Sequence, residues 1–196
     1  MKMRNGKLTV IIAIVGALLI ALAAGLMIFD TWHRSDSAKK APDIVSEMYT
    51  LMPEVHDSVP MNRVDNTMPA MQLDGQNFVG ILEVPMCSAA LPIGSEWDND
   101  VMDFPCRYTG SVYDVSLIIG GRGDAGQFGF TADISLGDRV MFTDTAGARY
   151  TYTVADIEKT DDVSLGNLSS GNFDLVLFAR DEYGFEYTVV RCSTGK

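Results

Sequence analysis

The longest hydrophobic stretch of the chain lies near its N-terminus. Residues 8–29 carry no formal charge and are rich in Ile, Leu, Ala and Val. A helix of this length, rising about 1.5 Å per residue, spans the roughly 30 Å hydrocarbon core of a bilayer. Lys2, Arg4 and Lys7 precede it, so the positive-inside tendency places residues 1–7 in the cytoplasm. The pattern predicts a single-pass transmembrane helix in the cell membrane, followed by an extracellular C-terminal part.

The same stretch admits a second interpretation, a cleaved signal peptide. Residues 8–20 have the length of an h-region, and Ala21-Leu22-Ala23 has the small-x-small form of a cleavage site. The apolar run nevertheless continues to Phe29, which is long for an h-region and favours a retained span. Under either interpretation the rest of the chain is exported.

Residues 30–75 are predicted to form a juxtamembrane spacer, a short helix and an arm. The chain is polar up to Lys40, and Pro42 suits the first turn of a helix that Pro53 ends. We expect its apolar stripe to pack on the following domain, since it lacks the basic face of a helix that lies on a membrane. After Pro53 no period is sustained, which indicates an arm that is either loose or packed over a groove through its Met residues. The stripe consists of Ile44, Val45, Met48, Leu51 and Met52.

From residue 76 onward, short apolar or alternating runs are separated by turn residues, which is typical of an all-β barrel or sandwich. Residues 144–147 are predicted to join two of the strands as a hairpin. The runs at 115–119 and 175–178 resemble strands buried on both faces. Almost no helix is expected here. The predicted strands are 78–84, 90–93, 115–119, 140–143, 150–154, 175–178 and 187–190.

Several short segments within residues 76–196 follow one another in a known order. They are Gly80-Ile81-Leu82-Glu83-Val84-Pro85, Leu91-Pro92-Ile93, Tyr108-Thr109-Gly110-Ser111, Leu117-Ile118-Ile119-Gly120, Phe128 with Leu136-Gly137-Asp138, Tyr150-x-Tyr152-x-Val154, Asp174-Leu175-Val176-Leu177-Phe178 and Val189-Val190-Arg191. This ordered series, behind an N-terminal anchor, resembles the sortase family. The resemblance implies a closed eight-stranded β-barrel on the outer face of a Gram-positive cell envelope. It also implies a cysteine transpeptidase that cuts an LPXTG-like sorting signal and joins the acyl fragment to a cell-wall or pilin amine.

The family's chemistry uses three side chains. At each of the three positions that the resemblance indicates, this sequence has a residue of another type. The thiolate at the end of the penultimate strand falls on Arg180, the histidine after the Gly-ended strand on Gly121, and the arginine of the last strand on Tyr187. Gly121 has no titratable group, and Arg180 is a permanent cation without a nucleophilic lone pair. Tyr187 can donate a hydrogen bond but lacks the charge that stabilises an oxyanion strongly. We therefore expect a pseudo-sortase without transpeptidase activity.

Such a protein would act by binding in the family's groove, which is floored by the last two strands. Arg180 and Tyr187 are the candidate binding residues, and the charge of Arg180 suits a carboxylate of a sorting-signal, pilin or cell-wall peptide. The alternative for Arg180 is an ion pair with Asp181, Glu182 or Glu186. A role in surface-protein assembly beside an active sortase is also open, with the short helix and the arm as the contacts.

The three cysteines leave further alternatives open. Cys192, at the end of the last strand, is the candidate nucleophile if the chain is an active transpeptidase with a relocated thiol. No histidine lies in residues 57–196, which disfavours that possibility. Cys87 and Cys106 either form a disulfide in the oxidising exterior or remain two free thiols. There is no CxxC pattern, so a structural zinc site is excluded.

The net charge of the chain limits the classes of partner that it can bind. The chain has a net charge of −11, and its first 29 residues carry only basic charges, so the exported part is more acidic still. An acidic domain argues against nucleic acid, whose phosphates need a basic face. No cofactor or metal is expected, although calcium held by clustered aspartates is an alternative to a solvated acidic face. These aspartates are Asp98, Asp100, Asp103, Asp161 and Asp162.

Overall fold

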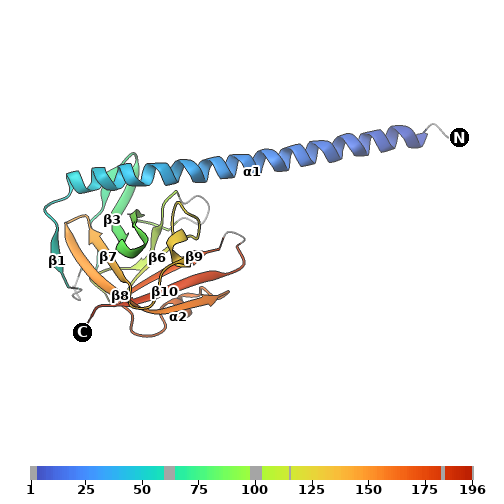
Figure 1. Cartoon of the computed structure of the whole chain (residues 1–196). Helices are drawn as coiled ribbons and strands as arrows, with labels where there is room; N and C mark the ends of the chain where they lie inside the picture. Colours follow the sequence, from blue (N-terminus) through green and yellow to red (C-terminus); the bar gives the residue numbers. More distant parts are fainter. Residues whose placement is uncertain (1–3, 60–64, 98–102, 115, 182–183, 196) are drawn as a thin grey trace. The chain divides into compact units, whose positions relative to one another are not determined.

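Helix α1 (Arg4–Leu51) comes first in the chain, and the computed structural model divides the protein into two units, Met1–Asp36 and Ser37–Lys196. The structure describes residues 4–59, 65–97, 103–114, 116–181 and 184–195, and the side chains of all of these except 4–9 and 26–37. Figure 1 shows α1 and, at its C-terminal part, the strands of the second unit.

The predicted membrane span, 8–29, extends at both ends beyond the residues whose side chains are described. Within the described part of the chain, no helix has both the length and the apolar character needed to cross a membrane.

The separate short helix expected to begin at Pro42 is wrong, because α1 continues through Pro42 without a break. A proline inside a helix removes one hydrogen bond, but strong helix formers such as Ala38 and Ala41 precede it and sustain the helix. The polar residues 30–40 are therefore helical as well. The predicted end before Pro53 is confirmed.

The apolar stripe of α1 lies within the second unit and packs on the residues that follow it there, as predicted. Met48 is fully buried, whereas Leu51 is 56% exposed and is the one exception in the stripe. The stripe residues Ile44, Val45, Met48 and Met52 pack with Ala41, Leu73, Phe78, Ile81 and Phe104.

Eight strands form a closed barrel. Neighbouring strands around the ring are β8, β10, β9, β6, β5, β4, β3 and β7, and β7 closes it by pairing with both β3 and β8. The expected closed eight-stranded all-β barrel is confirmed. Its strands are β3 (Gln76–Val84), β4 (Ala89–Gly94), β5 (Cys106–Gly110), β6 (Leu117–Arg122), β7 (Arg139–Asp144), β8 (Ala148–Thr160), β9 (Leu175–Arg180) and β10 (Tyr187–Ser193).

Short elements complete the second unit. Two strands lie in the predicted arm, and they pair with the barrel at β8 and at β3. A loose arm over 53–74 is therefore wrong for these parts, and Met68 is buried in the barrel core. These elements are β1 (His56–Ser58), β2 (Met71–Leu73), η1 (Pro85–Cys87), η2 (Gly129–Ala132) and α2 (Leu165–Leu168).

Side-chain alternation divides β9 and its neighbours between two apolar clusters. Leu175, Leu177 and Ala179 belong to the barrel core. Val176 and Phe178, the residues between them, belong to a separate cluster on the other face of the strand. Because successive side chains of a strand point to opposite faces, this second cluster covers the outside of the barrel. The strands are therefore buried on both faces, as the sequence predicts for 175–178.

Candidate functional site

The positions that the resemblance singles out lie at one end of the barrel. Strands β6 and β9 are parallel, with Gly121 opposite Ala179 and Arg122 opposite Arg180. Strand β10 runs antiparallel to β9 and places Tyr187 opposite Arg180. Residues far apart in the sequence thus form one row across three strand ends.

Within this row, Gly121 faces the barrel interior and Arg180 the exterior. A Cβ atom at Gly121 would lie 3.1 Å from Gln127 Oε1 and 3.1 Å from the nearest ring atom of Phe128, and Phe128 belongs to the barrel core. Arg180 lies on the face opposite to the inward-facing Ala179. The structure therefore brings Arg180 and Tyr187 together on the outer face, while Gly121 presents its Cα to the core.

Arg180 is exposed where β9 ends. Its Nη2 makes a long hydrogen bond of 3.5 Å to the carbonyl oxygen of Gly184. Gly184 has a φ of +77°, and a Cβ there would meet the Arg180 guanidinium at 2.9 Å. Among the described residues, neither Asp181 nor Glu186 forms an ion pair with Arg180; Glu182 lies outside them. The guanidinium of Arg180 therefore lies over Gly184, which has no side chain, and is exposed to solvent.

The turn after Arg180 also exposes an aromatic ring. The Asp181 carboxylate accepts a hydrogen bond of 2.8 Å from the Phe185 backbone N–H, and Gly184 N donates to the Asp181 carbonyl at 3.1 Å. These bonds close the turn, and the Phe185 side chain is 80% exposed. A cation and an exposed aromatic ring thus lie at the same end of the barrel.

Beside this row, aromatic rings cover the outer face of β6 and β9. Trp97 and Tyr108 both pack on Phe178, with ring centroids 5.2 and 5.3 Å apart. Tyr187 lies at the edge, 6.3 Å from the Phe178 centroid. This outer aromatic cluster contains Ile118, Leu168, Val176, Phe178 and Val189, with Trp97, Tyr108, Val163, Phe173 and Tyr187 packed against them. The chain's own side chains therefore cover much of the surface where a groove is expected.

Arg191 connects this region to α2. Only 3% of the residue is exposed. Its Nη1 lies 2.8 Å from carboxylate oxygens of both Asp156 and Glu158 on β8, and its Nη2 donates to the Asn167 carbonyl at 3.3 Å. One buried cation thus joins β8, β10 and α2. Sequence reasoning did not single it out for this role.

Cys192, the alternative nucleophile, lies inside the barrel core and is fully buried. Burial raises the pKa of its thiol to about 12. Along β10, four residues separate it from Tyr187 at the opposite end of the strand. His56 is on β1, paired with Ala148 at the start of β8. The structure does not bring Cys192 to the row of Arg180 and Tyr187.

The disulfide between Cys87 and Cys106 is not formed, and Cys87, Cys106 and Cys192 all carry thiols. Cys87 lies two residues before the start of β4, whereas Cys106 pairs with Gly94 at the far end of that strand. An extended strand of this length spans roughly 20 Å, far more than the Cα separation of a disulfide. The Cys106 thiol instead donates to the Phe104 carbonyl at 3.3 Å.

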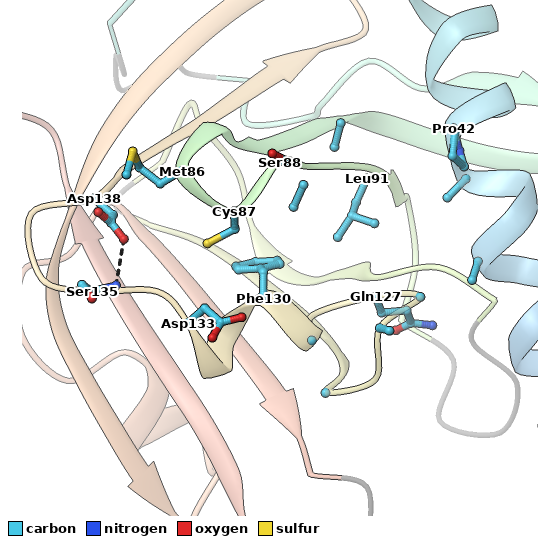
Figure 2. A pocket seen from close by; sticks show the side chains of 18 residues that line it. Pro42, Met86, Cys87, Ser88, Leu91, Gln127, Phe130, Asp133, Ser135 and Asp138 are labelled. Atoms are coloured by element: carbon cyan, nitrogen blue, oxygen red, sulfur yellow. Dashed lines mark hydrogen bonds between the residues drawn. The ribbon is translucent and has the colours of Figure 1, made fainter.

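A large cavity lies elsewhere in the second unit, at a place that sequence reasoning missed (Figure 2). Its volume is about 960 Å³, and Cys87 lies in it among Phe130, Asp133 and Asp138. Burial raises the pKa of the Cys87 thiol, and the negative charges of Asp138 and Asp133 raise it further. The small-residue segments 88–90 and 123–126 were the available signal, but nothing in the sequence shows that they face each other.

The aspartates weighed for calcium do not form a site within the described residues. Asp98 and Asp100 lie outside those residues. Asp103 accepts a long hydrogen bond of 3.5 Å from Gln76, and Asp162 accepts one of 2.8 Å from Ser164 N. In the part of the chain that is described, no three His, Cys, Asp or Glu side chains are grouped to hold a metal ion.

Solved sortase structures share this closed barrel. Sortase C1 from Streptococcus agalactiae is 20% identical, with a TM-score of 0.53 over 64% of this chain and 71% of that chain. Sortase A from Corynebacterium diphtheriae is 18% identical, with a TM-score of 0.51 over 83% and 84% of the two chains. Listeria monocytogenes sortase A is 17% identical, with a TM-score of 0.51 over 61% and 88%.

The fold is therefore that of the sortases, and the sequence resemblance is confirmed at that level. No family profile matches the chain, and no curated protein matches it either.

Proposed function

We propose that this protein is a sortase-like barrel without transpeptidase activity that binds a carboxylate-bearing peptide of the cell surface. The observation that carries the proposal is the solvent-directed guanidinium of Arg180, at the strand end where the resemblance places a thiolate. A carboxylate can accept two parallel hydrogen bonds from a guanidinium. The exposed ring of Phe185 adds apolar area beside the charge.

Inactivity is supported by what surrounds this strand end. Cys192 is buried with its pKa raised to about 12, so its thiol is protonated at neutral pH. Arg180 and Tyr187 supply neither the thiol nor the imidazole that acyl transfer in this family uses. Binding therefore suits these side chains better than acyl transfer.

The test uses the full chain and a fluorescent peptide, Leu-Pro-Ala-Thr, with either a free or an amidated C-terminus. We expect the free carboxylate to bind more tightly, and Arg180→Ala to weaken its binding about 10- to 100-fold. Arg139→Ala is the matched control, because Arg139 is an exposed arginine at the start of β7. Equal affinity for acid and amide, or equal loss in both variants, would contradict the proposal.

Membrane attachment through residues 8–29 is the second part of the proposal, supported by their lack of formal charge. The expected result is that the expressed full chain stays in the membrane fraction after an alkaline carbonate wash. Release of the intact chain by that wash would contradict a spanning anchor.

A further inference from the structure

Strand β4 is paired along its whole length on one side only. All of its residues pair with β3, whereas β5 meets it at one position, Gly94 opposite Cys106. In the described part of the chain, no strand pairs with residues 89–93 on the second side. A strand edge of this kind offers backbone N–H and C=O groups to an extended chain beside it.

The hydrogen bond at the end of β4 shows which residues face this open side. Gly94 N donates to the Pro105 carbonyl at 2.8 Å, away from β3. Since residues two apart in a strand direct their backbone groups to the same side, the backbone groups of Ala90 and Pro92 face this side as well. Pro92 is buried, however, and only residues 89–91 of the strand line the cavity. Pro92, which has no N–H, is tolerated there because the ladder with β3 loses no donor. The N–H and carbonyl groups of Ala90 are therefore the bonding groups that this side offers along the cavity.

The cavity described above lies against this edge, and residues 89–91 form one of its walls (Figure 2). The facing walls come from α1 at residues 38, 41 and 42 and from the turn at 123–129, where most side chains are Ala, Gly or Pro. Such small side chains leave the width that a peptide backbone needs. The volume of about 960 Å³ is at the upper end of ordinary ligand sites.

Charge selects the kind of side chain that the cavity accepts. Asp133 and Asp138 line it near Cys87, and no Lys, Arg or His is among its described lining residues. Both carboxylates raise the pKa of the Cys87 thiol, so their negative potential reaches into the cavity. A cationic side chain is favoured there and an anionic one is disfavoured.

We propose that an extended peptide segment carrying Lys or Arg binds as an added strand along residues 89–91 of β4, with its basic side chain facing Asp133 and Asp138. Backbone bonds to the open edge would supply general affinity, and the acidic pair would supply the preference for a basic residue. This site is separate from Arg180 and does not depend on the peptide binding proposed there.

The experiment captures peptides on the immobilised full chain from three pools of capped heptapeptides. The central residue is Lys, Gln or Glu, and the other positions are mixtures of Val, Thr, Ile and Tyr. We expect Lys peptides to be enriched over Glu peptides at least about ten-fold. The double variant Asp133→Asn, Asp138→Asn should retain capture but lose this preference, because an amide oxygen can still accept the 2.8 Å bond from Ser135 N.

Two further variants locate the site. Ala90→Pro removes the N–H on the open side and leaves the ladder with β3 intact, so it should lose capture. Arg180→Ala should capture Lys peptides as the unaltered chain does and should lose only Glu peptides held by Arg180, which separates this proposal from the previous one. Capture by Ala90→Pro equal to that of the unaltered chain, enrichment of Glu peptides by Arg180→Ala, or enrichment of no pool would overturn the proposal.

A measurement on the unaltered chain guards against misfolding of Ala90→Pro. The captured Lys peptides should slow alkylation of Cys87 by iodoacetamide and leave Cys106, at the other end of β4, unaffected. Unchanged alkylation of Cys87 would overturn the proposal. Dimerisation that Ala90→Pro abolishes, without peptide capture, would assign the edge to a second copy of this chain instead.

Discussion

Trp97 and Phe178 meet over Gly120, with their ring centroids 5.2 Å apart and their planes at 45°. A Cβ atom at Gly120 would overlap both rings. The absence of a side chain at this position of β6 is therefore what lets the outer aromatic cluster lie directly on the strand. The contact joins a segment after β4 to the floor of the expected peptide groove.

Gly120→Ala is expected to destabilise the protein by about 1–3 kcal/mol, because the added methyl group forces two aromatic rings to move. Gly166→Ala is the control, since the nearest atom to a Cβ at that position is 4.0 Å away. Urea unfolding followed by tryptophan fluorescence measures both. Equal stability of the two variants would show that Trp97 does not pack on Gly120.

Replacement of the buried cation Arg191 is also expected to lower the stability of the protein. Arg191→Leu removes its bonds to two carboxylates and to the Asn167 carbonyl, and we expect a loss of about 2 kcal/mol. The carboxylates are roughly half-exposed, with side-chain exposures of 48% and 41%, so they regain water and the loss stays moderate.

Arg149→Leu is the comparison for Arg191. Its ion pair with Glu83 is 3.5 Å long and partly exposed on both sides, so its removal should cost under about 1 kcal/mol. Thermal unfolding of both variants decides between these expectations. A larger loss for Arg149→Leu would contradict the importance of Arg191.

The buried thiol of Cys192 predicts how stability depends on alkaline pH. Its pKa is raised from 9.0 to about 12 in the folded protein. Its contribution is therefore fully present below pH 9 and is lost between pH 9 and 12, as the unfolded thiol ionises first. The slope is about 1.4 kcal/mol per pH unit. Cys192→Ala should lack this part of the pH dependence, and parallel pH profiles for the two proteins would refute the prediction.

Alkylation of Cys87 should depend on its acidic neighbours. Because Asp138 and Asp133 raise the pKa of this thiol, the double Asn variant should react faster with iodoacetamide at pH 8 and should have a pH profile shifted to lower values. Mass spectrometry of the modified peptides gives both rates. Cys192 should remain unmodified in the folded protein, and an unchanged Cys87 profile would contradict the electrostatic coupling.

The seven strands predicted from the sequence are present, because each carries a run of apolar or alternating residues. The one predicted at 115–119 begins at Leu117, and Val115 lies outside the described residues. Strand β5 is not predicted by such a pattern, because Cys106–Gly110 is half-buried throughout and its apolar and polar residues alternate only weakly. Pro42 was interpreted as a helix start, although helix formers on its N-terminal side carry α1 through it. Local patterns thus predict elements well when one face is buried, and less well when burial is partial.

The positions of Gly121, Arg180 and Tyr187 could be predicted because the resemblance to the sortases identifies the strand ends on which they lie. Their side-chain directions could not, because whether Gly121 points inward depends on the exact register of β6. The cavity at Cys87 had no sequence signature, since its walls come from segments far apart in the chain. The outer aromatic cluster likewise depends on Trp97, whose partner Phe178 is distant in sequence.

The place of β10 in the ring has a consequence for biosynthesis. Strand β10 lies between β8 and β9, so neither of these has its full set of neighbours until residues 187–193 have been made. A growing chain that ends earlier exposes the edges of β8 and β9, and that of β9 consists mostly of apolar residues, a state prone to aggregation. The barrel is therefore expected to close after translation of its last strand rather than strand by strand, and nascent chains would depend on chaperones until then.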